Sequence, residues 1–131
     1  MPCEISLVSS SPVTLPVLVE AAVAVDGSLV PRRIFDGWAT QLVDLHDVAV
    51  LTVELSRRIE DTFDIARLTR IAGLPDRLGL PGAVVEQAGF AEEFWWTEAT
   101  APWGRAGEPG IRIARRLGEL LSAQLLVEEG R

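Results

Sequence analysis

The chain has one histidine and one cysteine, the two residue types that most often supply a catalytic base or nucleophile. His46 lies between Asp44 and Asp47 in the segment VDLHDV, and an Asp–His pair is one part of a catalytic triad. No serine occupies a G-x-S-x-G motif that would complete such a site. Cys3 alternates with apolar residues, which is typical of a structural cysteine in a core. We therefore predict no catalytic residue, a histidine in a turn or at a strand edge, and a buried cysteine.

Metal and cofactor sites are not indicated by the spacing of ligand-type residues. One cysteine and one histidine form neither a zinc-finger-type site nor a disulfide within the chain. Carboxylates occur in pairs, such as Glu92 with Glu93, but no calcium-loop motif is present. No G-x-G-x-x-G or Walker A pattern is present either. We expect no metal and no cofactor.

Charge is unevenly distributed along the chain, whose formal net charge is −7. Residues 1–65 carry ten acidic residues and four arginines, whereas residues 66–131 carry nine and eight. This balance opposes nucleic acid as a partner, because phosphate contacts require clustered cations. If the acids between Asp36 and Asp64 share a face, they form a negative patch that attracts a basic protein. An ordinary solvated face is the alternative.

Tryptophan is the second unusual feature, with four residues in 131. Trp95 and Trp96 are adjacent, so on a strand their side chains point to opposite faces of the sheet. An exposed tryptophan beside acids suits a protein-binding hot spot, and it equally suits the wall of a small-molecule pocket. The predicted partner-contact residues are Asp36, Asp44, Asp47, Trp95, Trp96 and Trp103. The alternative pocket combines tryptophan with His46, Glu98 and Arg105.

The elements that position these residues begin with a strand, Cys3–Val8, in which apolar residues alternate. A helix over Leu15–Val25 follows, with Thr14 as its N-cap and a proline in its first turn. Two strands of a meander are predicted next, over Leu29–Asp36 and Trp38–Leu45. The apolar segment Val48–Leu55 predicts a central strand buried on both faces.

The second half of the chain begins with a helix predicted from Asp61 or Thr62 to Ala72. The segment Leu74–Gly82 is rich in proline and glycine and predicts a loop between the two halves of the chain. For Ala83–Gly89 we predict a short strand or a turn. The last predicted elements are a strand over Phe94–Ala99, a helix starting at Pro109 with the apolar face Ile111, Ala114, Leu117 and Leu121, and a strand over Leu125–Glu128.

This order of elements predicts a single α+β domain over residues 1–131, with its two halves meeting near 74–82. We expect a mixed or antiparallel sheet with two to three helices on one face, ferredoxin-like or a variant of that arrangement. The longest apolar run, Leu15–Val25, is too short to span a membrane. The N-terminal segment lacks the basic region of a signal peptide. We therefore expect a cytoplasmic protein without membrane contact.

The last third of the chain resembles the closing strand–helix–strand unit of small actinobacterial immunity-type proteins of polymorphic toxin systems. The segments that carry the resemblance are WWTEATAPWGRAGEPG, IRIARRLGELL and SAQLLVEEG. The resemblance implies a cytoplasmic protein that binds and blocks a cognate toxin, often by presenting acids to a basic cleft.

Two functions of different classes follow from these observations. The leading hypothesis is a non-enzymatic protein-binding module, an immunity-like inhibitor of a basic partner such as a toxin nuclease. The alternative is a small α+β enzyme or ligand-binding protein with a tryptophan-lined pocket, which would require an enclosed cavity rather than a flat acidic surface. The sequence is compatible with a monomer or with a homodimer formed through an edge strand.

Overall fold

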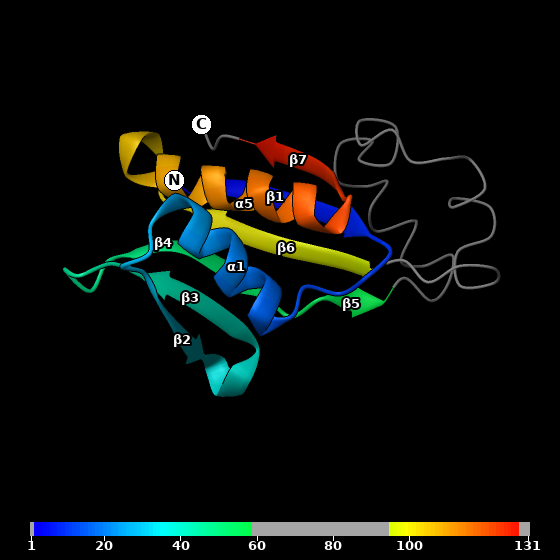
Figure 1. Ribbon diagram of the computed structural model, residues 1–131, viewed down its shortest axis with the longest axis horizontal. Helices are drawn as coiled ribbons and strands as arrows, with labels where there is room; N and C mark the ends of the chain where they lie inside the picture. Colours follow the sequence, from blue (N-terminus) through cyan, green and yellow to red (C-terminus); the bar gives the residue numbers. More distant parts are fainter. Residues whose placement is uncertain (1, 59–94, 129–131) are drawn as a thin grey trace.

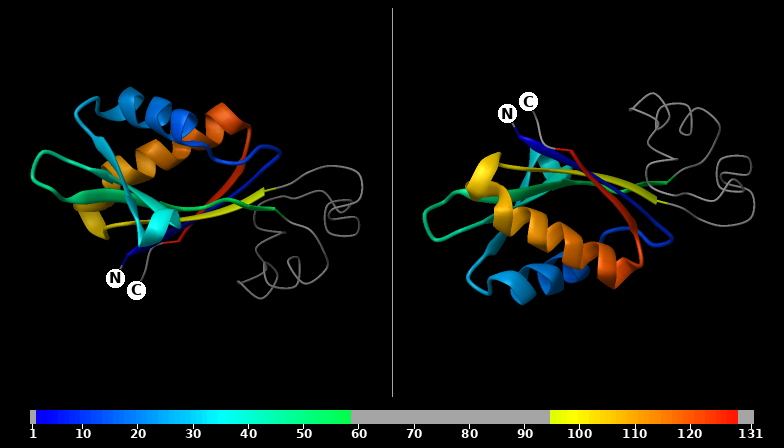
Figure 2. Two further views of the ribbon diagram at one scale, coloured as in Figure 1. Left: turned by 90° about the horizontal axis from the view of Figure 1, so that it is seen from below. Right: turned by 90° about the horizontal axis from the view of Figure 1, so that it is seen from above.

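The computed structural model describes residues 2–58 and 95–128 of the chain. These residues form one sheet whose strand pairs are all antiparallel, with two helices packed side by side on one of its faces (Figures 1 and 2). The prediction of an α+β fold with helices on one face is confirmed. The ferredoxin-like detail stays a prediction.

The elements follow one another as β1 (Cys3–Ser9), α1 (Leu15–Val25), β2 (Val30–Ile34), the 3-10 turn η1 (Phe35–Gly37), β3 (Ala39–Val43), β4 (Ala49–Glu54), β5 (Arg57–Arg58), β6 (Trp95–Ala101), the 3-10 turn η2 (Gly104–Gly107), α5 (Glu108–Leu121) and β7 (Gln124–Glu128). The strands lie in the order β2-β3-β4-β6-β1-β7, and the short β5 also pairs with β6. Each strand predicted within the described residues is present, with ends that differ by at most two residues.

The sheet brings its first and last strands, β1 and β7, together at one edge. Strand β1 lies between β6 and β7, so that Ile5 is opposite both Ala99 and Val127. The alternation of side chains along β1 turns Cys3, Ile5 and Leu7 towards the helices, where all three are buried. The predicted core position of Cys3 is thereby confirmed. The core also contains Leu18, Ala21, Ala22, Leu42, Val50, Leu51, Val53, Ala99, Ala101, Ile113, Ala114 and Leu117.

Helix α1 begins and ends at the predicted residues. Pro16 lies in its first turn, where a missing N–H breaks no helical hydrogen bond. Thr14 is the N-cap residue, and its carbonyl oxygen accepts the backbone N–H of Leu18 at 3.0 Å. Its hydroxyl makes no capping hydrogen bond, so the backbone conformation and the proline define this helix start without the expected side-chain cap.

Strand β4 corrects one expectation, because it is buried on one face rather than on both. Leu51 and Val53 point into the core, whereas Thr52 and Glu54 are only half-buried. A register shift at Leu42/Val43 of the neighbouring strand accommodates an extra residue, so that Val50 and Leu51 are both buried. The apolar run in the sequence reflects this irregularity, and the two described helices, α1 and α5, cover the same face of the sheet (Figure 2).

Helix α5 corrects another expectation. Its buried face consists of Gly110, Ile113, Ala114, Leu117 and Gly118. Ile111 and Leu121, which were predicted to lie on that face, are only partly buried at its margins. Arg112, Arg115, Arg116 and Glu119 are exposed, as predicted.

The helix predicted from Asp61 or Thr62, the loop Leu74–Gly82 and the element Ala83–Gly89 lie outside the described residues. Within the described part of the chain, neither helix is long and apolar enough to cross a membrane.

Candidate functional site on the helix-free face of the sheet

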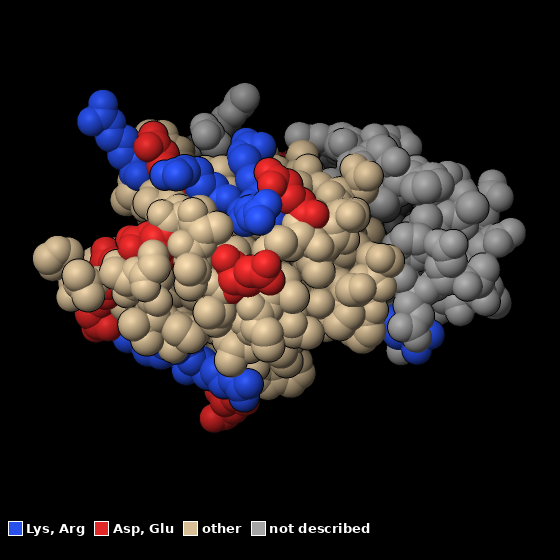
Figure 3. Space-filling model, in the orientation of Figure 1, with Lys and Arg blue, Asp and Glu red and all other residues tan. Residues whose placement is uncertain are grey.

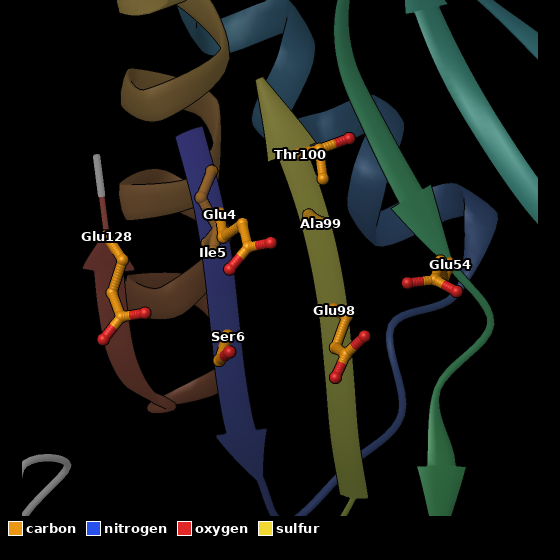
Figure 4. A pocket seen from close by; sticks show the side chains of 8 residues that line it. All are labelled: Glu4, Ile5, Ser6, Glu54, Glu98, Ala99, Thr100 and Glu128. Carbon is orange, nitrogen blue, oxygen red and sulfur yellow. The ribbon is translucent and has the colours of Figure 1, made fainter. Parts of the chain in front are cut away.

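Four glutamates from four neighbouring strands project from the face of the sheet that neither α1 nor α5 covers (Figure 4), and we call it the helix-free face with respect to these two described helices. Glu4 of β1 is opposite Glu128 of β7 and Thr100 of β6. Strands β4 and β6 are antiparallel, with Val53 opposite Ala99. The next residue of β4, Glu54, therefore lies beside the preceding residue of β6, Glu98. We call Glu4, Glu54, Glu98 and Glu128 the acidic face.

The acidic face surrounds a hollow of about 120 Å³. Its other lining residues are Ile5, Ser6, Ala99 and Thr100. Ser6 and Thr100 alternate with the buried residues of their strands. They therefore place polar side chains on the floor of the hollow, whereas the opposite face of the same strands is apolar. Among the described residues, no group of three or more His, Cys, Asp or Glu side chains is arranged to hold a metal ion. The glutamates form a surface that displays negative charge.

Glu98 lies at the centre of this surface and is the most perturbed of its carboxyl groups. Partial burial, followed by the charge of Glu54 and a hydrogen bond between the two carboxyl groups, raises the pKa of Glu98 above its ordinary value of 4.5. Glu4 raises the same pKa further, and Arg57 lowers it. A half-buried carboxylate next to a second one is a position that favours a bound cation.

Arg57 of β5 borders the acidic face at one end. Its guanidinium lies 5.5 Å from the centre of the Trp96 ring, and its Nη2 lies 3.7 Å from Oε1 of Glu54. A guanidinium in this position combines an aromatic contact with an ion pair.

Two exposed aromatic residues border the acidic face on another side. Phe35 and Trp38 are 74% and 68% exposed, and they line a second hollow of about 240 Å³ together with Ala39, Thr52, Glu54 and Thr100. The linings of the two hollows share Glu54 and Thr100, so the hollows lie next to each other. We call Phe35 and Trp38 the aromatic rim.

The backbone of the turn explains why the aromatic rim is exposed. Phe35 and Asp36 have φ values of 51° and 54°, in the left-handed region that bulky residues rarely adopt. These angles reverse the chain between β2 and β3 and leave the side chain of Phe35 outside the core. Strained conformations of this kind concentrate at binding sites and turns.

The predicted contact acids do not lie together. Asp44 is in the turn between β3 and β4, where its Oδ1 accepts the backbone N–H groups of His46 at 2.8 Å and Val48 at 3.0 Å. Asp47 lies in the same turn and accepts a hydrogen bond from Arg32 at 2.8 Å. Asp36 lies at the other end of β3, about 17 Å away along a five-residue strand. Of the rest of the predicted patch, Glu54 lies on the acidic face, whereas Glu60, Asp61 and Asp64 lie outside the described residues.

The predicted tryptophans are also separated. Trp96 is buried and Trp95 half-buried, and their adjacent positions on β6 place them on opposite faces of the sheet. Trp103 follows the far end of β6, roughly 20 Å from Trp96, and is 61% exposed. Trp38 was not predicted as a contact residue, although it is more exposed than Trp103. Its position directly after Gly37 in a turn was the one available sign in the sequence.

The three residues of the alternative pocket lie in different parts of the molecule. His46 is exposed in the turn between β3 and β4, as expected for a turn histidine, and Arg105 is exposed in η2. Glu98 lies on the acidic face, and neither His46 nor Arg105 lines its hollow.

The helix-covered side of the molecule has a different charge pattern. Arginines and acidic residues are interspersed there (Figure 3). One of these contacts is the ion pair between Arg116 and Glu119, at 3.0 Å. Opposite charges within reach of one another cancel at a distance, so this side carries no comparable negative surface.

The raised pKa of Glu98 predicts how its contribution to stability varies with pH. A carboxyl group whose pKa is higher in the folded state binds its proton more tightly there, so its contribution is largest below pH 4.5 and is lost as pH rises through the raised pKa. Glu98→Gln should remove this dependence. We expect the free energy of unfolding of the wild type, measured by urea titration between pH 4 and 7, to fall relative to that of the variant as pH rises.

Glu54→Gln is the matched test of the cause, because it leaves Glu98 in place and removes the neighbouring charge. The pH dependence should then be reduced but still present, since partial burial remains. Parallel pH profiles for the wild type and Glu98→Gln would contradict the prediction.

Comparisons with family models, with curated proteins and with solved structures each found no match for this chain.

Proposed function

We propose that the chain is a protein-binding module that engages a basic partner through the acidic face and the aromatic rim. The observation that carries this proposal is the gathering of four glutamates on a helix-free sheet face, next to two highly exposed aromatic residues. An immunity-like inhibitor of a basic protein such as a toxin nuclease, acting in the cytoplasm, is the most concrete form of the proposal.

The two parts of the surface have complementary roles in such an interface. Carboxylates attract a basic partner over several ångströms and orient it, which increases the association rate and makes binding sensitive to salt. Large aromatic side chains supply most of the short-range energy when a partner covers them. Phe35 and Trp38 lie next to Glu54, so that one partner surface reaches both.

The shape of the surface favours a protein over a small molecule as the partner. The hollows at the acidic face and at the aromatic rim have volumes of about 120 and 240 Å³. Pockets that enclose small ligands generally have volumes of about 300 Å³ or more. The residues of the alternative pocket are dispersed, whereas those of the acidic face are adjacent.

The test is affinity capture from a lysate of the host with immobilised full-length protein, followed by washing at low and then high salt. The wild type should retain a basic protein that elutes at high salt. The triple variant Glu4→Gln, Glu54→Gln, Glu98→Gln should retain at least about tenfold less of it, because three charges that face the partner are lost. Glutamine keeps the size of each side chain, and circular dichroism checks that the variant is folded.

The matched control is Glu20→Gln, Glu108→Gln, Glu119→Gln, which removes three exposed carboxylates from the helix-covered side. This control has the same net charge as the first variant and should bind like the wild type. Equal loss of binding in both variants would show that net charge, and not the acidic face, holds the partner.

A further inference from the structure

The helix-free face already contains one guanidinium in a defined position. Arg57 lies over the ring of Trp96 and close to the carboxylate of Glu54. The pair that receives it is therefore an indole ring and a glutamate on neighbouring strands. Both contacts are favourable for a planar cation, because the ring attracts positive charge through its face and the carboxylate through its oxygens.

The same pair of groups recurs on the other side of Glu54. Trp38 and Glu54 line one hollow, and Glu54 and Glu98 line the hollow next to it. None of the described residues that line these two hollows is an arginine. The exposed indole of Trp38 thus lies on one side of Glu54, while Arg57 approaches the same carboxylate from the side of Trp96 and Glu98 is its neighbour on β6.

We propose that the two adjoining hollows, lined by Trp38 and Glu54 and by Glu54 and Glu98, receive an arginine side chain of the partner. This inference rests on the proposed function and specifies its central contact. The guanidinium would lie against the exposed ring of Trp38 and donate hydrogen bonds to the carboxylates, repeating the arrangement of Arg57 with Trp96 and Glu54.

Arginine fits these hollows better than lysine for two reasons. Its planar group covers an aromatic ring and donates to a carboxylate at the same time, whereas an ammonium group is a compact, strongly hydrated charge. Its several N–H donors also reach two carboxylates together, and Glu54 and Glu98 lie side by side. The exposed Phe35 adds apolar surface for the methylene groups of the side chain.

The experiment is a nuclear magnetic resonance titration of the ¹⁵N-labelled full chain, in which each tryptophan contributes one indole N–H signal. The signal of Trp38 is identified by its absence in Trp38→Leu. The probe is a capped Gly-Ser peptide with one central arginine, and the same peptide with lysine or with neutral citrulline serves for comparison. The arginine peptide should shift the Trp38 signal to saturation, the lysine peptide should bind several-fold more weakly, and the citrulline peptide should cause no saturable shift.

Variants locate the binding site, with binding of the arginine peptide measured by calorimetry or by the remaining amide signals. Trp38→Leu should weaken binding about threefold to fivefold, in line with an exposed cation–π contact. Glu54→Gln with Glu98→Gln should weaken it at least about tenfold. Trp103→Leu removes a similarly exposed tryptophan elsewhere and should leave binding unchanged.

Equal binding of the arginine, lysine and citrulline peptides, or an equal loss in Trp38→Leu and Trp103→Leu, would overturn the inference. An absent peptide response would also overturn it, even if the triple glutamine variant loses a partner captured from lysate. In that case the acidic face binds its partner by another contact and the proposed function stands. If neither the triple glutamine variant nor the variants of the two hollows lost binding of the partner, both the inference and the proposed function would be refuted.

Discussion

Gly110→Ala is expected to lower the free energy of unfolding by about 3 kcal/mol or more, a large fraction of the stability of a domain of this size. Gly110 is buried on α5, where a Cβ atom would collide with the carbonyl oxygen of Val50 and lie 3.1 Å from the Cβ of Ala101. The first contact is with backbone, which cannot rotate away as a side chain does. The alanine variant therefore has to push the helix off β4 and β6.

Gly118→Ala is the control, because it makes the same change on the same buried face two turns later. The nearest atom to its added Cβ would be the Cβ of Leu125 at 3.9 Å, an ordinary van der Waals contact. Alanine in a helix interior is favoured over glycine by about 0.5 to 1 kcal/mol. Urea unfolding should therefore show that Gly110→Ala is less stable, and Gly118→Ala slightly more stable, than the wild type. A shift of both in the same direction would refute the steric explanation.

The elements of the fold could be predicted because their signals are local. Apolar alternation in Cys3–Val8 and a proline in the first turn of Leu15–Val25 depend on residues only a few positions apart, and both segments fold as expected. The faces that each element buries depend on its neighbours. The sequence of β4 is apolar enough for a strand covered on both sides, yet both described helices lie on the same side of the sheet.

The acidic face could not be assembled from the sequence, because it depends on the registers of four strands. Glu4 and Glu128 are adjacent across β1 and β7 although nearly the whole chain separates them. Glu98 was considered only with His46 and Arg105, which lie elsewhere. A weaker sign was present, since Glu4, Glu54 and Glu98 each alternate with buried residues of their own strand, which is typical of a sheet with one solvated face.

The contact residues predicted from composition could not be placed for the same reason, because their surroundings depend on the fold. Asp44 and Asp47 are close in sequence and close in space, but their carboxylates serve the turn and Arg32. Charge reversal at Asp44 would therefore disturb the turn as well as any interface, so the acidic face offers a cleaner test. Trp38 directly follows a left-handed turn, which the sequence marks with a single glycine.

Ile113→Ala is the second change with a large expected effect, about 3 kcal/mol of unfolding free energy. The side chain of Ile113 is completely buried beneath α5, between the helix and the sheet. Removing its outer carbons leaves a cavity that the surrounding strands cannot close, because Gly110 already brings this part of the helix as near to β4 as backbone contact allows. The cost should therefore lie well above that of the lost apolar surface alone.

Ile111→Ala is the matched comparison, and it distinguishes the predicted helix face from the observed one. The predicted face ran through Ile111, Ala114, Leu117 and Leu121, whereas the buried face observed on α5 includes Ile113 together with Ala114 and Leu117. Ile111 is only partly buried, so its truncation should cost about 1 kcal/mol. Urea unfolding of the two variants measures the difference directly. Equal costs would mean that α5 is rotated by a fraction of a turn from the orientation in which Gly110 contacts Val50.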